Sequence, residues 1–211
     1  MDADFWLQQW QNNDIGFHAD EVNPMLADYF QALGLAEGCR VFLPLCGKTL
    51  DIAWLLAKGY RVVGAELSQQ AIEQLFSELG VVPAVLKVTG FKHYHAKNID
   101  IFVGDIFELS AQVLGSIDAI YDRAALVALP AAMRERYAAH LITLSNTAPQ
   151  LLICFEYDQQ RMAGPPFSVN ADAVAKLYRD SYRLNLLYSR DVVGGLKGQC
   201  AASENVWLLA V

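Results

Sequence analysis

A glycine and a carboxylate stand at a spacing typical of sheets that bind nucleosides. Gly47 follows the apolar run 41–43 and a proline, and Glu66 ends a second apolar run, 19 residues after Gly47. In doubly wound sheets, a carboxylate about 20 residues after the first glycine turn accepts hydrogen bonds from ribose hydroxyls. The pair predicts a nucleoside site. The alternative is that Glu66 is an ordinary solvated acid at a strand end.

The turn around Gly47 does not match a phosphate-binding loop. Gly47-Lys48-Thr49 resembles the end of that motif, but Phe42 occupies the position of its first glycine. The dinucleotide fingerprint needs three glycines, and this turn has only one. A nucleoside triphosphate and a nicotinamide dinucleotide are therefore disfavoured. S-adenosylmethionine fits better, because it carries adenosine, no phosphate, and an amino-acid tail that can lie against the first turn.

Two further predicted strands end in polar residues. Asp105 follows one of them, where its carboxylate can accept the adenine amino group, and Ile106 and Phe107 can pack on the ring. Arg123 follows the next strand. An arginine there can bind a ligand carboxylate or an anionic substrate, which makes Arg123 the one candidate catalytic residue. For each charged residue taken alone, an exposed loop charge is an equally good interpretation.

Aromatic residues near the N-terminus and a proline pair late in the chain can border the same site. Trp6, Trp10 and Phe17 stand beside polar neighbours, which suits a helix packed on the domain. They also suit a lid over a cationic sulfonium, since a cation gains about 0.5–2 kcal/mol over an aromatic face. The adjacent prolines that end at Pro166 stiffen a loop that can hold Phe167 as a second rim.

The histidines and cysteines give no clear metal signature. His93 and His95 would share one face of a strand, but no third ligand stands at a telling spacing, so we expect no metal site. His18 lies close to the proposed lid and is interpreted as an ordinary histidine. The four cysteines form no C-x-x-C pair and lie in or beside apolar runs, which favours buried, reduced thiols.

Apolar strands alternate with amphipathic helical patterns along most of the chain. This alternation indicates an α/β fold with a mostly parallel sheet covered on both faces, and ligands bind such sheets beyond the carboxyl ends of the strands. Residues 1–33 are expected to form a helical segment that acts as a lid. The expected strands are 40–43, 60–65, 100–103, 117–121, 151–155, 184–187 and 206–211, with a small hairpin near 91–96. The expected helices are 4–11, 21–33, 48–58, 69–79, 130–144 and 170–180.

Composition narrows the class of protein. The 211 residues suit one domain, 1–211, and 54% of them are hydrophobic, which is enough for a sizeable core. The net charge is −7, with 16 basic and 23 acidic residues, which argues against a nucleic-acid partner. No apolar stretch is long enough to cross a bilayer, and the N-terminus is acidic where a secretory signal would be basic. We therefore expect a cytoplasmic protein without a membrane partner.

Several strings of residues, spread nearly from end to end, resemble the thiopurine S-methyltransferase family. The most specific are Pro44-Leu45-Cys46-Gly47-Lys48 and Asp122-Arg123-Ala124-Ala125-Leu126-Val127-Ala128. The others are Trp6-x3-Trp10, Ile15-Gly16-Phe17-His18, Val62-Val63-Gly64-Ala65-Glu66-Leu67-Ser68, Ile106-Phe107 and Gly164-Pro165-Pro166-Phe167. Animal members of the family have glycine where this chain has Ala124.

The resemblance implies a Rossmann-like class I methyltransferase with a seven-stranded sheet and S-adenosylmethionine as its cofactor. It implies that the position of Phe17 lies near the substrate. It also implies cofactor contacts at Trp10, Leu45, Glu66, Asp105, Ile106 and Arg123, in addition to Gly47 of the first turn. Bacterial relatives are associated with methylating selenium and tellurium compounds as well as thiols.

The predicted function is transfer of a methyl group to the sulfur of a small, often aromatic, thiol such as a thiopurine, with selenium or tellurium compounds as further acceptors. The reaction would be an in-line displacement, and the chain is expected to act as a monomer. The alternative is a non-catalytic nucleoside-binding module or regulator. A nicotinamide oxidoreductase is a third interpretation, disfavoured by the missing glycines.

Overall fold

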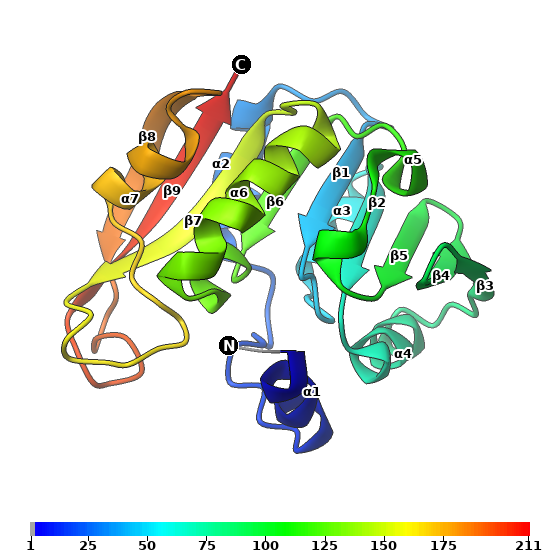
Figure 1. Ribbon diagram of the computed structural model, residues 1–211, viewed down its shortest axis with the longest axis horizontal. Coiled ribbons are helices and arrows are strands. Elements are labelled where there is room, and N and C mark those ends of the chain that lie inside the picture. The colour runs from blue at the N-terminus through cyan, green and yellow to red at the C-terminus, as the bar shows by residue number, and fades with distance from the viewer. Residues whose placement is uncertain (1–2) are drawn as a thin grey trace.

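The computed structural model describes residues 3–211, and its centre is one mixed sheet with the strand order β3-β4-β5-β2-β1-β6-β7-β9-β8 (Figure 1). Five adjacent strands are parallel, and the two strands at each edge are antiparallel. The parallel strands are β1 (Arg40–Pro44), β2 (Arg61–Glu66), β5 (Ile99–Val103), β6 (Ala119–Arg123) and β7 (Gln150–Tyr157). The edges are β3 (Ala84–Val88) with β4 (Phe91–Ala96), and β8 (Arg183–Asp191) with β9 (Ala202–Ala210).

The expected seven strands are confirmed as the contiguous part of this sheet from β5 to β8, but the total of seven is wrong. The sheet has nine strands, because the hairpin expected near 91–96 is complete and pairs with β5 as β3 and β4. The hydrophobic pattern does not predict β3, because this strand lies at the edge of the sheet and four of its five residues are exposed. The sheet is therefore mixed, with as many antiparallel as parallel pairings.

Helices cover both faces of the sheet, as the strand–helix alternation predicts (Figure 1). The α-helices are α1 (Ala3–Gln11), α2 (Pro24–Tyr29), α3 (Asp51–Ala57), α4 (Gln69–Glu78), α5 (Ala111–Leu114), α6 (Ala131–Ser145) and α7 (Ala171–Tyr178). Three 3-10 helices are η1 (Phe30–Leu33), η2 (Ile106–Glu108) and η3 (Leu126–Ala128). Within residues 3–211, none of these helices has both the length and the apolar character needed to span a membrane.

Alternate residues of the parallel strands pack into two separate cores. Phe42 and Val63 join the core beneath α5, α6 and α7, whereas their neighbours Val41 and Val62 join the core beneath α2, α3 and α4. All four are fully buried. Burying a side chain of this size contributes about 1.5–3 kcal/mol, so the two cores fix the register of the strands and hence the position of every strand end.

Local signals explain where the helices begin. Ser68 accepts a hydrogen bond from the backbone of Ala71 and caps α4, and Asn170 caps α7 in the same way through Ala173. Helix α3 begins at Asp51, three residues later than the pattern predicts. The intervening residues turn tightly, with Gly47 at φ +52°. The turn places backbone amides, not helix, directly after β1.

Candidate functional site

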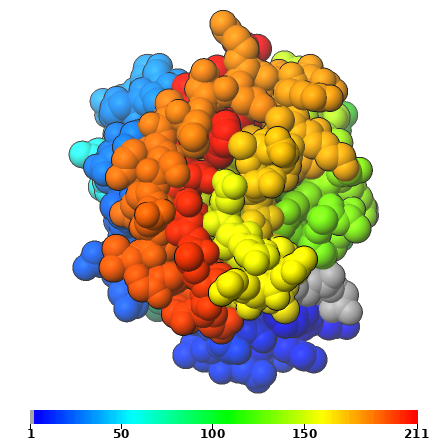
Figure 2. All heavy atoms as spheres, turned by 90° about the vertical axis from the view of Figure 1, so that its left-hand side faces the viewer, coloured from blue at the N-terminus to red at the C-terminus, as the bar shows by residue number. Residues whose placement is uncertain are grey.

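A cavity of about 850 Å³ lies at the carboxyl ends of the parallel strands. Its walls come from α1, from the loops after β1, β5 and β6, from the end of β2, and from two late loops that follow β7 and β8. Figure 1 shows α1 facing the strand ends, and Figure 2 shows the late loops (yellow and orange-red) reaching down to the N-terminal segment (dark blue). The volume falls in the range that is usual for small-molecule sites.

Glu66 is the buried acid of this cavity, and its carboxylate is held by the backbone. One oxygen accepts a hydrogen bond from the Ser68 amide at 2.8 Å, and the other accepts one from the Gly47 amide at 2.8 Å. Burial raises the pKa of Glu66, and these amides oppose that rise. Each oxygen keeps a second lone pair. The carboxylate can therefore accept two vicinal hydroxyl groups without moving, as a ribose would require.

The turn after β1 is not built for phosphate. The Gly47 amide, which would point at a phosphate oxygen, donates to Glu66 instead. Lys48 forms an ion pair with Glu78, with 2.6 Å between Nζ and Oε1. A carboxylate at this place would also repel an anion. These contacts agree with the prediction from sequence that the site takes a nucleoside without a phosphate group.

Trp10 closes the cavity over Gly47. A Cβ atom added to Gly47 would lie 3.0 Å from the indole ring of Trp10, so the absence of a side chain lets the helix approach the turn. Trp10 is buried although it belongs to the first helix. Its ring meets Phe17 edge to face, with 5.4 Å between the centroids, and Phe17 meets Trp6 at 5.6 Å. The aromatic residues predicted to form a lid thus make one continuous wall.

Besides Lys197 at φ +52°, two non-glycine residues that line the cavity have left-handed backbone. Leu45 has φ +47° in the turn after β1, and Ala124 has φ +62° directly after β6. Left-handed backbone costs an L-residue roughly 1–2 kcal/mol. Such strain is concentrated where a chain must direct a side chain or an amide at a ligand. A glycine at position 124 would adopt this backbone angle without that cost.

The end of β5 presents one polar and one apolar group, as predicted. Asp105 is exposed and lines the cavity, and its carboxylate accepts a hydrogen bond from the Phe107 amide at 3.0 Å. Ile106 is buried and also lines the cavity. The guanidinium of Arg136 lies 4.0 Å from the centre of the Phe107 ring. Together these residues form a flat apolar shelf with a carboxylate at its edge, which suits an adenine ring.

The two charged residues at the end of β6 point in different directions. Arg123 lines the cavity, and its Nη1 lies 3.4 Å from the Phe17 carbonyl oxygen, which connects the strand end to the N-terminal segment. Asp122 is fully buried and accepts hydrogen bonds from the Leu126 amide at 3.0 Å and the Tyr137 hydroxyl at 2.8 Å. Burial raises the pKa of Asp122 to about 6. Arg123 therefore faces the cavity, whereas Asp122 supports the loop that follows β6.

The late loops form the far rim. Pro166 lines the cavity, as predicted, together with Pro165. Phe167 is not among the lining residues; its ring faces Arg134, with 5.7 Å between the guanidinium carbon and the ring centre, so a substrate contact there stays a prediction. Lys197, from the loop between β8 and β9, donates to the Pro165 carbonyl oxygen at 2.9 Å.

Lys197, Cys46 and His18 are among the lining residues that the sequence does not assign to the site. Lys197 carried no signal, because only the tertiary structure brings the loop after β8 to the cavity. Cys46 lines the cavity, but burial and the neighbouring Glu66 raise its pKa well above the ordinary value, so it is a neutral thiol. His18 lines the cavity too, and burial together with Lys48 lowers its pKa, which leaves a neutral imidazole at pH 7.

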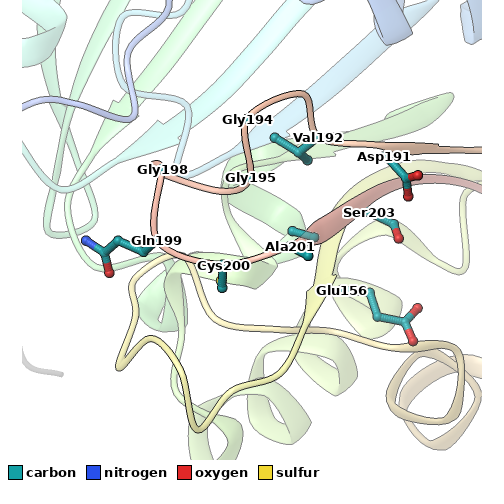
Figure 3. Close-up of a pocket in the computed structure, with 11 residues that line it drawn as sticks. Glu156, Asp191, Val192, Gly194, Gly195, Gly198, Gln199, Cys200, Ala201 and Ser203 are labelled. Carbon is teal, nitrogen blue, oxygen red and sulfur yellow. The ribbon is translucent and has the colours of Figure 1, made fainter.

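A second hollow of about 590 Å³ lies at the other side of the loop between β8 and β9 (Figure 3). It is bordered by small residues and three glycines, and two carboxylates, Glu156 and Asp191, stand at its edge. Glu156 is engaged by the Asn205 side chain at 3.2 Å. Glu156 is the one lining residue near the carboxyl end of a parallel strand, β7, and the others belong to β8, β9 and the loop between them. This hollow is therefore not the site that the sheet topology predicts.

Solved structures with similar folds include methyltransferases. One is 1,6-didemethyltoxoflavin-N1-methyltransferase of Burkholderia thailandensis, with a TM-score of 0.65 and 16% identity, matching 99% of this chain and 87% of that one. Another is magnesium protoporphyrin IX methyltransferase of Synechocystis PCC 6803, with a TM-score of 0.66 and 13% identity over the full length of both chains. Both structures hold S-adenosylhomocysteine. At these identities the likeness confirms the class I methyltransferase fold.

Sequence comparison is more specific. The chain is 55% identical over 210 residues to a thiopurine S-methyltransferase of Xanthobacter autotrophicus, and the match covers 99% of each chain. It is 54% identical to that of Teredinibacter turnerae, covering 100% of this chain and 98% of the relative. The family model for thiopurine S-methyltransferase matches residues 1–210. The chain therefore belongs to the thiopurine S-methyltransferase family.

Proposed function

We propose that this chain transfers a methyl group from S-adenosylmethionine to the sulfur of a small aromatic thiol of the thiopurine type. The observation that carries the proposal is the buried Glu66 carboxylate, fixed by two amides in a turn that offers nothing to phosphate. Membership of the family supports the same conclusion, and so does the S-adenosylhomocysteine bound in structures that share the fold.

The residues present fit the cofactor. When bound, S-adenosylmethionine supplies a methyl group activated by a sulfonium. Glu66 would bind the ribose hydroxyls, Asp105 the adenine amino group, and Ile106 the face of the adenine ring. The indole of Trp10, already packed on Gly47, can lie beside the sulfonium, where a desolvated cation–ring contact is worth about 2 kcal/mol. Leu45 and Arg123 also line the cavity and would contact the amino-acid tail.

The acceptor would enter between the aromatic wall and the late loops. Phe17 and Pro166 border that side of the cavity, and both suit a flat heteroaromatic ring. A heteroaromatic thiol is already substantially ionised near neutral pH, so the chain needs no strong base. Arg123 can attract the thiolate, and the neutral imidazole of His18 can accept a proton from a less acidic thiol. Cys46 takes no part as a nucleophile, because its thiol stays protonated.

Alignment supplies most of the rate. Holding two reactants in line can give effective molarities of about 10⁵ M or more, and closing the cavity excludes water. Selenium and tellurium compounds are further candidate acceptors, since they need the same alignment. We also propose that the chain works in the cytoplasm as a monomer, with one site per single domain of residues 1–211.

Release of S-adenosylhomocysteine with a panel of acceptors tests the function. The panel contains thiopurines, simple aryl thiols, and selenite and tellurite as inorganic acceptors. We expect rapid release with the thiopurines and none without an acceptor. Tight binding of S-adenosylmethionine in calorimetry, with no release across the whole panel, would instead identify a non-catalytic binding module.

A further inference from the structure

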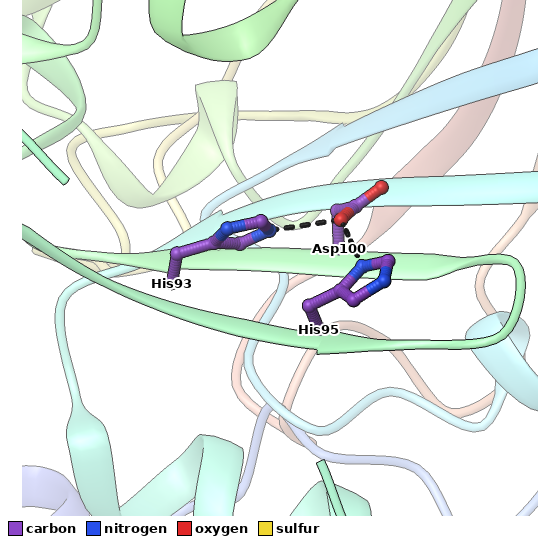
Figure 4. A group of neighbouring side chains, drawn as sticks. All are labelled: His93, His95 and Asp100. Carbon is purple, nitrogen blue, oxygen red and sulfur yellow. Dashed lines mark hydrogen bonds and ion pairs between the residues drawn. The ribbon is translucent and has the colours of Figure 1, made fainter. Parts of the chain in front are cut away.

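The hairpin edge of the sheet brings together two imidazoles and a carboxylate. His93 and His95 lie on β4, and Asp100 lies on β5, where it pairs directly with His95 in the antiparallel register. Figure 4 shows both imidazole rings directed at the same carboxylate. His93 Nε2 lies 2.8 Å and His95 Nδ1 lies 2.7 Å from Asp100 Oδ1. The third ligand that the sequence did not reveal is thus supplied by the neighbouring strand.

The three groups form a ligand set that suits a metal ion. Their nitrogen and oxygen atoms all lie within 4.8 Å of one another. Imidazole nitrogens with a carboxylate oxygen are typical ligands of Zn²⁺ and of neighbouring first-row divalent ions. We propose that His93, His95 and Asp100 bind a divalent transition-metal ion, with Zn²⁺ as the best match. Three protein ligands leave a coordination position for water.

The geometry needs only a small adjustment. Ligands of a tetrahedral ion with bonds of about 2.1 Å stand about 3.4 Å apart. Relative to the Asp100 oxygen, His93 must therefore retreat by roughly 0.6 Å and His95 by roughly 0.7 Å from their hydrogen-bonded positions. His95 can move, because 54% of its side chain is exposed. His93 is more confined: its ring stacks on Phe102, with centroids 4.5 Å apart and 14° between the planes. His93 is therefore held in place, whereas His95 can adjust its position to the ion.

The surroundings orient the carboxylate. Arg40 Nη2 lies 3.4 Å from Asp100 Oδ2, so the arginine engages one oxygen and leaves Oδ1 for the ion. Such outer contacts are usual around metal-binding carboxylates. Burial raises the pKa of Asp100, but hydrogen bonds from the two histidines and the charge of Arg40 outweigh that effect, and the pKa falls below its ordinary value. The Arg40 charge also weakens cation binding, so we expect micromolar affinity.

An ion at this place would join β4 to β5 and would not take part in methyl transfer, because none of its three ligands lines the cavity. Metal binding stabilises the folded chain in proportion to the logarithm of free metal above the dissociation constant. The site should therefore raise the melting temperature without competing with S-adenosylmethionine. This inference does not depend on the proposed function, and its failure would leave that function untouched.

The test is titration of the full chain, free of any histidine tag and stripped with a chelator. Zn²⁺ is followed by calorimetry and Co²⁺ by its visible absorption. We expect one ion per chain in the wild type, and binding at least tenfold weaker in His95→Ala, which removes a side chain that is 54% exposed. Asp100→Asn should behave alike. His140→Ala is the matched control, since it removes an imidazole elsewhere and should bind Zn²⁺ normally.

Three results would overturn the proposal. The first is no Zn²⁺ binding below millimolar concentration. The second is equal binding by the wild type and His95→Ala. The third is binding that survives both site variants but disappears in Cys39→Ser, or a Co²⁺ spectrum with thiolate charge-transfer bands. That outcome would place the ion on Cys39, the cysteine that is not fully buried. The proposed site would be supported if Zn²⁺ raised the melting temperature of the wild type but not that of His95→Ala.

Discussion

Replacing Glu66 by glutamine should weaken binding of S-adenosylmethionine about 150-fold. Both carboxylate oxygens already accept one backbone amide and have one lone pair left for a ribose hydroxyl. A glutamine side chain keeps one oxygen and places an amino group against the Gly47 or Ser68 amide, donor against donor. One ribose contact is lost and the other is no longer charge-assisted. With 1.5–3 kcal/mol for each charge-assisted bond, the total is about 3 kcal/mol.

Calorimetry with the wild type, Glu66→Gln and a matched control measures this loss. Glu108→Gln is the control, because Glu108 is exposed and is not among the cavity-lining residues. A second comparison isolates the ribose: adenosine should bind the wild type better than 2′,3′-dideoxyadenosine, and the variant should not distinguish them. Thermal unfolding must first show that the variant is folded at the assay temperature, since an unpaired buried amide costs about 1–3 kcal/mol. Affinities within threefold of each other would refute the assignment.

Four further outcomes follow from the structure. Gly47→Ala should weaken cofactor binding about tenfold, because the new Cβ lies 3.0 Å from Trp10 and the residue has φ +52°; unchanged calorimetry would contradict this. Ala124→Gly should stabilise the chain by up to about 1 kcal/mol in urea unfolding, since glycine relieves the backbone strain at φ +62°. Part of this gain is cancelled, because glycine also raises the conformational entropy of the unfolded chain. Burial raises the pKa of Asp122 from 3.8 to about 6, so its contribution to stability is complete below pH 3.8 and is lost as the pH rises through 6. The free energy of unfolding of the wild type relative to Asp122→Asn should therefore fall by about 3 kcal/mol over that interval, and parallel pH profiles would count against it. Amide exchange over residues 4–18 should slow when S-adenosylhomocysteine is added, because the aromatic wall would close on the ligand, and identical exchange rates would show that the segment does not respond.

The spacing of residues along the chain locates Glu66 beside the first glycine turn. The separation of Gly47 and Glu66 along the chain is typical of one nucleoside site, and the structure joins the two residues by a hydrogen bond. This prediction was possible because a parallel strand, a turn and a helix have nearly fixed lengths, so a strand end can be located from the hydrophobic pattern alone. The turn that replaces the first part of the expected helix at 48 was not visible, since its residues are compatible with either conformation.

Contacts between segments that are distant along the chain could not be predicted from the sequence. Asp100 was not recognised as a partner of His93 and His95, because the register of an antiparallel pair is fixed by packing and not by spacing. Lys197 reaches Pro165 only because β8 and β9 form the last hairpin of the sheet. The prolines before Phe167 predict that its ring lies at the rim, but the ring faces Arg134, a helix residue that no local pattern connects to it.

The indole that rests on Gly47 has a consequence for the speed of the catalytic cycle. The product S-adenosylhomocysteine, held at the end of β2, would lie beneath the first helix. It could dissociate only when that helix moves away. Opening of this helix, and not methyl transfer, would then limit the turnover rate. Added sucrose or glycerol, which thickens the solvent, would slow such an enzyme even when every reactant is saturating.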